Sequence, residues 1–337
     1  MKTPVAEQLL PWQQTQWNRL NIAREHGRLP HALLLTGPAG LGKLEFARLL
    51  GNSLVCESPG IQNMPCGVCK HCRLALAEGH PDIRNVNPEE EGKAIKVDAI
   101  RELVDQSIMS VAGTRYRVFI ISPAEAMGVA AANALLKTLE EPVARSLLIL
   151  ISANPGKLLA TIKSRCQQLA FVIPPGALAH AWLAEQIGEN GAKSADLLRL
   201  ARGAPLLARQ MADNDELQCY NQLMKEFLGL AGNRAEPLLL AEQWQKQQDI
   251  SLSLNYMKRW LIDIILVGNG ARLGGDSSSD PSKDLKSLAS RLDMKAVHLL
   301  LDSLFEMERR LVNNINPRLA LEQLLLHWVH VNKQGVT

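Results

Sequence analysis

The sequence predicts an α/β domain built on a parallel sheet, followed by a half that is helical throughout. Between about Ala32 and Ile151, short apolar runs alternate with helical patterns, which is typical of a parallel sheet covered by helices. The strand-like runs are ALLL at 32–35, VFII at 118–121 and LLILIS at 147–152. No such run recurs beyond residue 173, where leucines take helical spacings, as in LALEQLLLHWV at 319–329.

Composition limits the class of protein. A length of 337 residues with 47% hydrophobic content suits two or three globular domains. The 37 basic and 34 acidic residues leave a charge of +3, too small to indicate a nucleic-acid partner by itself. No segment approaches the roughly 20 apolar residues of a membrane span, and the start lacks the apolar run of a signal peptide. We therefore expect a cytoplasmic protein with no membrane partner, in which clustered cysteines bind metal rather than form disulfides.

A domain boundary is expected at Ile173-Pro174-Pro175-Gly176. The prolines and glycine end a strand predicted over Phe171-Val172-Ile173, and they forbid a helix across the junction. The expected division is an α/β domain over 1–173, a small helical domain over 174–210 and an all-α domain over 211–337.

The segment Gly37 to Lys43 reads GPAGLGK and fits the phosphate-binding pattern GxxxxGK. In that pattern glycines let backbone N–H groups curl around phosphates, and the lysine adds a positive charge. The segment follows the strand ALLLT and opens the helical run LEFARLLGNSLV, which is the context that the motif requires. We therefore expect a P-loop, with Gly37, Gly42 and Lys43 as candidate nucleotide-binding residues.

The oxygen ligands that an active P-loop ATPase uses are missing. The motif ends in Leu44, where a hydroxyl should bind Mg²⁺. Ser122 and Pro123 follow the strand that should end in acidic residues, and the next acid is Glu125. We expect hydrolysis to be absent or negligible and ATP binding to be doubtful. The alternative is that the acids come from another strand.

Four cysteines cluster between residues 56 and 72. Cys56, Cys66, Cys69 and Cys72 have the spacing C-x9-C-x2-C-x2-C, which suits four thiolates around one tetrahedral Zn²⁺. Four thiolates leave no open coordination position, so we expect a structural zinc that staples an insertion over 56–72.

Other interpretations of this insertion stay open. An iron–sulfur cluster would need a fourth cysteine where Leu76 stands. His71 and His80 are alternative ligands, although such residues are more often exposed. Because Lys70, His71 and Arg73 surround the ligands, the insertion is also a candidate nucleic-acid-binding module.

Several segments together resemble one family. They are HALLLTGPAGLGK at 31–43, the cysteine insertion, IRELV at 100–104, NALLKTLEEP at 133–142 and the triplet Ser164-Arg165-Cys166. The chain resembles a bacterial clamp-loader subunit of DNA polymerase III over its whole length. The resemblance implies a P-loop domain of the AAA+ type with a small helical lid domain, followed by an all-α collar domain.

Within the family the chain looks most like the delta prime type. The gamma/tau subunit keeps the hydroxyl and an acidic pair, and active relatives carry a sensor arginine that the segment 203–207, GAPLL, lacks. The resemblance therefore implies a subunit without ATPase activity inside a DNA-directed DNA polymerase holoenzyme, a nucleotidyltransferase complex. The alternative is an ATP-hydrolysing gamma/tau-type subunit.

The resemblance also assigns partners. In this family the arginine of the SRC triplet reaches ATP on a neighbouring subunit, so Arg165 is implied to be an arginine finger in trans. By itself Arg165 is equally compatible with a salt-bridged surface residue. The implied partners are gamma/tau and delta subunits in a pentameric hetero-oligomer, with the sliding clamp and primer-template DNA reached through the complex. Lys137, which the family places near the inner face of the ring, is a candidate contact to DNA phosphates.

Two features of the second half remain to be placed. Trp244, Trp260 and Trp328 are expected to lie either in the core of the collar or at a subunit contact. The polar stretch GGDSSSDPSKD at 274–284 is expected to be a surface loop. Cys166 and Cys219 are isolated, and we interpret them as small apolar residues.

Overall fold

The structure is a computed structural model, and it describes residues 8–90, 92–108, 116–188, 193–232, 235–247, 250–271, 282–311 and 316–334. The chain divides into two compact units. Unit 1 comprises Met1–Gly191 and Ala201–Arg209, and unit 2 comprises Ala192–Leu200 and Gln210–Thr337. The three-domain division at 173 and 210 stays a prediction.

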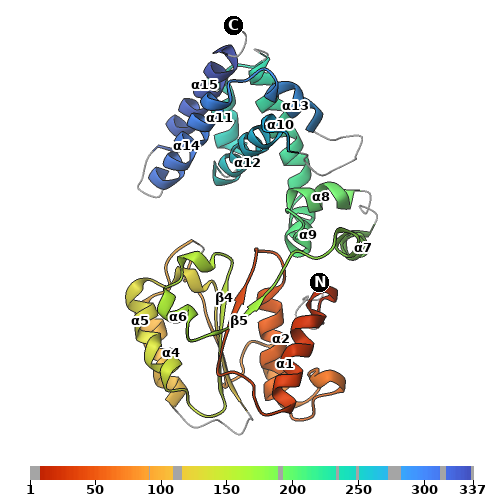
Figure 1. Cartoon of the computed structure of the whole chain (residues 1–337), viewed down its shortest axis with the longest axis vertical. Helices are drawn as coiled ribbons and strands as arrows, with labels where there is room; N and C mark the ends of the chain where they lie inside the picture. The colour runs from red at the N-terminus through yellow and green to blue at the C-terminus, as the bar shows by residue number, and fades with distance from the viewer. Residues whose placement is uncertain are drawn as a thin grey trace. The chain divides into compact units, whose positions relative to one another are not determined.

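Unit 1 is built on a parallel sheet of five strands in the order β2-β3-β4-β1-β5 (Figure 1). The strands are β1 (Ala32–Thr36), β2 (Ile83–Val86), β3 (Arg117–Ile121), β4 (Ser146–Ser152) and β5 (Gln167–Ala170). The central strands β1, β3 and β4 are buried almost throughout, because helices cover both faces of the sheet. The three predicted apolar strands are confirmed, and so is the predicted α/β class.

The two edge strands differ from expectation. β5 ends at Ala170, so the predicted strand over Phe171-Val172-Ile173 is wrong. The N–H of Phe171 still donates to the carbonyl oxygen of Thr36 at 2.7 Å, but the prolines that follow have no N–H with which to continue the ladder. β2 was not predicted, because an edge strand buries little apolar surface and shows little alternation.

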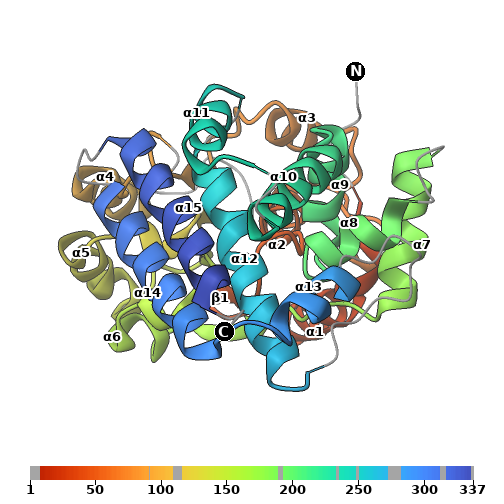
Figure 2. The same ribbon diagram turned by 90° about the horizontal axis from the view of Figure 1, so that it is seen from above.

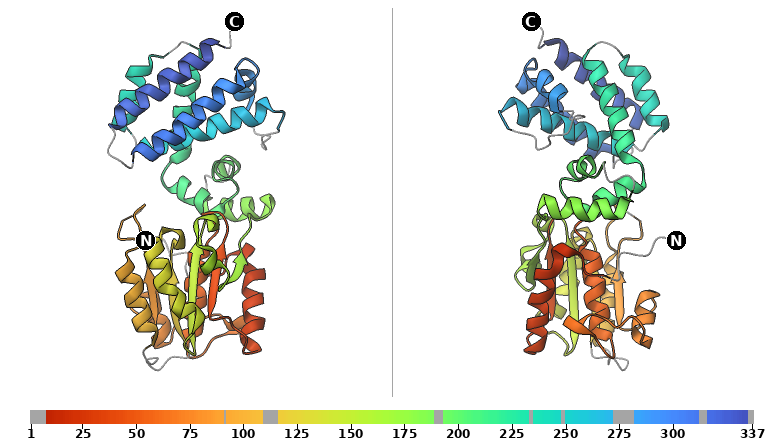
Figure 3. Two further views of the ribbon diagram at one scale, coloured as in Figure 1. Left: turned by 60° about the vertical axis from the view of Figure 1, so that its left-hand side comes forward. Right: turned by 90° about the vertical axis from the view of Figure 1, so that its right-hand side faces the viewer.

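Helices cover both faces of this sheet (Figures 1 and 3). Ile100 of α4, Leu135 of α5 and Ile162 of α6 share one buried cluster with side chains of β1, β3 and β4. α2 packs on the opposite face, where the Cβ position of Gly51 lies 3.5 Å from Val118. The helices of unit 1 are α1 (Gln14–Glu25), α2 (Lys43–Val55), α3 (Lys70–Leu76), α4 (Val97–Ile108), α5 (Val129–Glu140), α6 (Ala160–Lys163), α7 (Gly176–Ile187) and the start of α9 (Pro205–Asp213).

The described residues of unit 2 form helices and no strand, which confirms the predicted all-α half. The helices are α8 (Ser194–Leu200), α10 (Glu216–Ala231), α11 (Pro237–Gln247), α12 (Ile250–Gly268), α13 (Ser282–Ala289), α14 (Met294–Leu311) and α15 (Pro317–Gln334). Figure 2 shows α12, α14 and α15 side by side. The predicted loop at 274–284 lies mostly outside the described residues, and its last three residues belong to α13. None of the described helices has both the length and the apolar character that crossing a membrane requires.

Tryptophans fill the core of unit 2. Trp244, Trp260 and Trp328 are fully buried, so the structure places all three in the core rather than on the surface. Trp328 stacks on Phe227 with ring centroids 4.2 Å apart, and its Nε1 donates to the Phe227 carbonyl oxygen at 3.1 Å. The Nε1 of Trp244 donates to Glu226 Oε2 at 2.7 Å. Each of these two indoles therefore buries its ring while its one polar atom is satisfied.

Replacing Trp328 by alanine should lower the free energy of unfolding by about 3–5 kcal/mol, because it leaves a large cavity and removes the hydrogen bond to the Phe227 carbonyl oxygen. Guanidinium titration followed by far-ultraviolet circular dichroism measures the change. Leu326→Ala, on the same helix but 49% exposed, is the matched control and should change stability by about 0.5 kcal/mol or less. Equal midpoints for the two variants would contradict the assignment of Trp328 to the core.

Candidate functional site

The GPAGLGK segment forms the turn between the end of β1 and the start of α2 at Lys43, as predicted for a P-loop. Gly37 has φ of 137°, and a Cβ there would lie 2.1 Å from the carbonyl oxygen of Phe171. Gly42, at the N-cap of α2, has φ of 79°, and its Cβ would lie 2.5 Å from Leu10 Cδ1. Both positions therefore need glycine for backbone conformation and for space.

The side chain of Lys43 turns back onto its own loop. Its Nζ donates to the carbonyl oxygens of Gly37 and Pro38, each at 2.6 Å, and the residue is only 6% exposed. Burial lowers the pKa of the Lys43 ammonium, and the carboxylates of Glu125 and Glu45 oppose that shift. Two of its three donors are thus used on backbone groups, where a nucleotide phosphate would otherwise accept them.

Side chains from a preceding turn cover the same loop. Trp12 Nε1 and Gln13 Nε2 each donate to the carbonyl oxygen of Leu41 at 3.0 Å, and Gln13 Nε2 also reaches the Gly42 carbonyl oxygen at 2.8 Å. Both donors belong to the short 3₁₀ helix η2 (Pro11–Gln13). Sequence reasoning missed them, because one indole and one amide outside a periodic pattern carry no signal.

The segment 203–207, predicted to lack a sensor arginine, packs on this loop. The N–H of Leu206 donates to the carbonyl oxygen of Gly40 at 3.1 Å. A Cβ on Gly40 would lie 2.5 Å from the Cβ of Leu207, so the two backbones are in close contact. Two leucines therefore lie against the loop where active relatives are expected to present a cation.

No carboxylate is found directly after β3, where a metal-binding acid is expected. Ser122 and Pro123 occupy those positions. Glu125 Oε1 accepts hydrogen bonds from the N–H groups of Ala153 and Asn154, at 2.9 and 3.0 Å. Its other oxygen is buried and has no hydrogen-bond partner among the described residues. The nearest acid in sequence is therefore engaged, through one oxygen, in holding the turn after β4.

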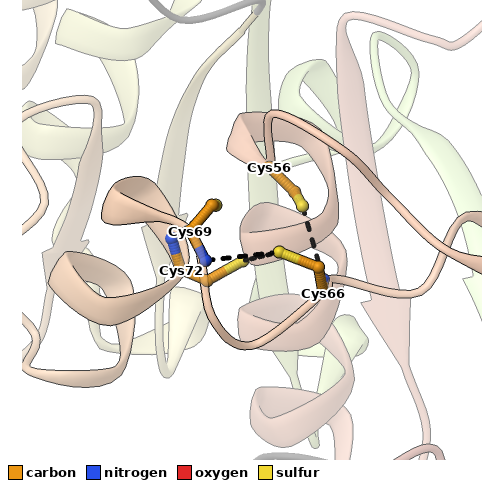
Figure 4. A group of neighbouring side chains, drawn as sticks. All are labelled: Cys56, Cys66, Cys69 and Cys72. Carbon is orange, nitrogen blue, oxygen red and sulfur yellow. Dashed lines mark hydrogen bonds between the residues drawn. The ribbon is translucent and has the colours of Figure 1, made fainter.

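The four clustered cysteines converge on one point (Figure 4). Their sulfur atoms all lie within 4.8 Å of one another. Cys56 is the C-cap of α2, Cys69 caps the start of α3, Cys72 lies in α3, and Cys66 comes from the loop between these helices. A tetrahedral zinc site with Zn–S bonds of about 2.3 Å places its sulfurs about 3.8 Å apart. Because the Sγ atoms of Cys66 and Cys72 are 3.9 Å apart, the group fits a four-thiolate metal site.

Backbone N–H groups point at three of these sulfurs. The N–H groups of Cys66, Cys69 and Cys72 donate to the sulfurs of Cys56, Cys66 and Cys69 respectively, each at 3.4 Å. Hydrogen bonds from the backbone, first that of Cys69, lower the pKa of the Cys66 thiol to about 6. Burial raises the pKa of Cys56 and of Cys72. A cation at the centre would offset that burial cost, because it stabilises the thiolate form of all four.

The two histidines of the insertion lie outside the cysteine group. His71 Nδ1 is 2.8 Å from His80 Nε2, and His80 Nδ1 accepts the N–H of Asp82 at 3.0 Å. His80 is 3% exposed, so the expectation that it is an exposed residue is wrong. Because the Asp82 N–H fixes Nδ1 of His80 as an acceptor, its Nε2 donates to His71, whose own Nε2 lies 3.4 Å from Glu57 Oε1.

Arg165 follows Ser164, the C-cap of α6, and its side chain is 35% exposed. Its Nη2 is 2.6 Å from Glu140 Oε1, and its Nη1 donates to the carbonyl oxygen of Thr161 at 3.0 Å. Within this chain Arg165 therefore forms a salt bridge, as expected if it is a salt-bridged surface residue. Lys137 is exposed on α5. The roles of Arg165 and Lys137 toward partners stay predictions.

Known proteins match the chain along nearly its whole length. The family model described as DNA polymerase III, delta subunit, matches residues 12–174, and the model of that subunit's C-terminal part matches residues 214–330. DNA polymerase III subunit delta' (delta prime) of Pseudomonas aeruginosa is 34% identical over 330 residues, covering 97% of this chain and 99% of that protein. The chain belongs to the delta prime family of DNA polymerase III. This confirms the family that the sequence motifs resembled.

Part of the chain also matches a second subunit of DNA polymerase III. DNA polymerase III subunit gamma/tau of Mycobacterium bovis is 36% identical over 191 residues, but the match covers 55% of this chain and 33% of that protein. Among solved structures, a gamma subunit-related protein of Thermotoga maritima covers 94% of the chain at 18% identity, with a TM-score of 0.47. The gamma/tau match is thus partial, whereas the delta prime match spans both proteins.

Gly42→Ala should lower the free energy of unfolding by about 2–4 kcal/mol, the sum of a left-handed backbone cost and overpacking against Leu10. Gly27→Ala is the matched control, because Gly27 has φ of 65° but no heavy atom within 4 Å of its Cβ position. The control should pay only the backbone cost of about 1–2 kcal/mol. Denaturant titration of both variants measures the difference, and equal losses would show that the loop yields to a side chain.

Proposed function

We propose that this chain is a delta prime subunit of a clamp loader that does not hydrolyse ATP itself. It takes part in the ATP-dependent loading of a sliding clamp onto primed DNA. The observation that carries the proposal is the P-loop whose lysine is bonded to its own backbone: Lys43 Nζ lies 2.6 Å from two carbonyl oxygens of the loop. Membership of the delta prime family supports the place of the chain in DNA polymerase III.

The pocket is poorly suited to phosphoryl transfer. That reaction depends on positioning and on charge stabilisation by Mg²⁺ and cationic side chains. Leu44 offers no oxygen to a metal, and Ser122 and Pro123 supply no carboxylate. A nucleotide would also have to displace Lys43 from two hydrogen bonds, which reduces the net free energy of binding. These features support the expectation that ATP binding by this chain is doubtful.

Arg165 is proposed to act on ATP bound by a neighbouring subunit, as an arginine finger in trans. A guanidinium supplied at a subunit interface stabilises charge on the transferring phosphoryl group. Ile162 and Cys166, on either side of Arg165, are both buried in the core cluster beneath α5 and α6. The arginine thus projects from a rigid base, which is what a precisely placed catalytic group needs.

The proposed partners are the gamma/tau and delta subunits of a pentameric ring, together with the clamp and primer-template DNA. Apolar side chains that remain exposed on α14 and α15 support contacts between collar domains. These are Leu299, Phe305, Leu319 and Leu326, with exposed fractions of 40% to 60%. Lys137 is the proposed contact to DNA phosphates.

In the reconstituted complex, Arg165→Ala should reduce hydrolysis at the site that Arg165 completes by about 10³-fold or more. Arg165→Lys keeps the charge but loses the planar, two-armed guanidinium, so it should retain only part of the wild-type ATP turnover. DNA-stimulated ATP turnover with an ATP-hydrolysing partner measures both variants. The isolated chain should show no turnover above background, with or without Lys43→Ala. Wild-type turnover in the Arg165→Ala complex would exclude the finger.

The four clustered cysteines are proposed to hold one structural Zn²⁺. Elemental analysis should find one zinc per chain, and Cys69→Ser should lose it together with part of the thermal stability. Cys219→Ser is the control, since this cysteine packs beside the core of unit 2 and should leave the zinc in place. Iron in place of zinc, or no metal in freshly purified protein, would contradict the proposal.

A further inference from the structure

Two helix ends hold the guanidinium of Arg165. Its Nη2 lies 2.6 Å from the carboxylate of Glu140, the last residue of α5. Its Nη1 donates to the carbonyl oxygen of Thr161, in the last turn of α6. The C-terminus of α5 carries partial negative charge and the Thr161 carbonyl oxygen is an acceptor, so the arginine lies where a cation is stabilised. If the ion pair with Glu140 were broken, the hydrogen bond to the Thr161 carbonyl oxygen would still position the arginine side chain.

Glu140 is an unusual residue for the end of a helix. A carboxylate at a helix C-terminus is disfavoured by the partial negative charge of the unpaired carbonyl groups. Glu141 follows directly at the C-cap and adds a second negative charge. Among the described residues, the ion pair of Glu140 is with Arg165 and not with Lys137, one turn earlier on the same helix. The arginine therefore offsets local repulsion, while the carboxylate neutralises the arginine.

This ion pair is exposed and easily exchanged. The side chains of Arg165 and Glu140 are 35% and 50% exposed. Ion pairs this accessible to water favour the paired state over the separated state by about fivefold at most. A triphosphate carries more negative charge than one carboxylate and can accept from both arms of a guanidinium, so it competes strongly for the same N–H groups.

We infer that Glu140 is a competing counter-ion for Arg165, which the γ-phosphate of a neighbour's ATP must displace before the finger engages. The inference rests on the proposed role of Arg165 as a finger. While Glu140 holds Nη2, the guanidinium is partly neutralised and one of its arms is occupied. Nucleotide binding at the neighbouring site and release of Glu140 are therefore coupled. Glu140 acts through Arg165 and touches no reacting atom, so it is a positioning residue.

The test compares variants of the full chain in the reconstituted complex, and it follows the turnover that depends on Arg165. That turnover is the difference between complexes with Arg165 and with Arg165→Ala. Glu140→Gln, which has the same shape but no charge, should lower the ATP concentration for half-maximal turnover by about two- to fivefold. The maximal rate should stay unchanged, because Glu140 is released before the chemical step. A merely structural residue would not separate these two quantities.

Three further variants make the result specific. Glu140→Ala should give the same shift as Glu140→Gln, which keeps the test valid if either variant assembles poorly. Glu140→Asp keeps the charge and should remain near wild type. Glu141→Gln is the matched control, since it removes a neighbouring charge that has no ion pair among the described residues, and it should shift nothing.

The outcomes separate the two proposals. If Arg165→Ala lowers turnover but Glu140→Gln leaves the half-maximal concentration unchanged or raises it, the competition inference is wrong and the finger stands. If Arg165→Ala leaves turnover unchanged, the finger is excluded and the inference falls with it. The double variant Glu140→Gln with Arg165→Ala should match Arg165→Ala alone, and any additional gain would show that Glu140 acts without Arg165.

Discussion

The hydrogen bonds from the Lys43 ammonium to the carbonyl oxygens of Gly37 and Pro38 hold the two ends of the phosphate-binding turn together. The side chains of Trp12 and Gln13 also donate hydrogen bonds to this turn, at the carbonyl oxygen of Leu41. With several of its carbonyl oxygens bonded to side chains of the protein, the turn joins the central strand β1 to the helix α2 as a fixed corner. The sheet and the helices that position Arg165 are built around that corner.

Two cations of unit 1 illustrate how burial separates scaffold from candidate site. Lys43 is 6% exposed and donates two of its three N–H groups to its own loop, whereas the side chain of Arg165 is 35% exposed and is paired with a half-exposed carboxylate. A buried charge gives up its partners only at a large desolvation cost, whereas an exposed pair exchanges readily. Of these two cations, the one whose contacts exchange more readily is therefore Arg165, which lies outside the P-loop.

The apolar runs of β1, β3 and β4 could be predicted because strands buried on both faces need continuous apolar sequence. The edge strands β2 and β5 could not, since their order comes from backbone pairing to neighbours that the local sequence does not reveal. The cysteine cluster was predictable because metal ligands have characteristic spacings. The cover by Trp12 and Gln13, the burial of His80 and the pairing of Glu140 with Arg165 depend on tertiary proximity, which leaves no pattern along the chain.

The contacts of Gly40 and Gly42 bear on how such a subunit evolves. A single substitution that placed a hydroxyl at Leu44 would supply one metal ligand, yet Leu206 and Leu207 would still press against the loop and Gln13 would still hold its carbonyl groups. If this chain does not use nucleotide, as proposed, a change at Leu44 alone would leave these contacts on the loop in place. The packing of Leu206, Leu207 and Gln13 on the loop would then make the proposed loss of ATP hydrolysis harder to reverse than a single missing hydroxyl suggests.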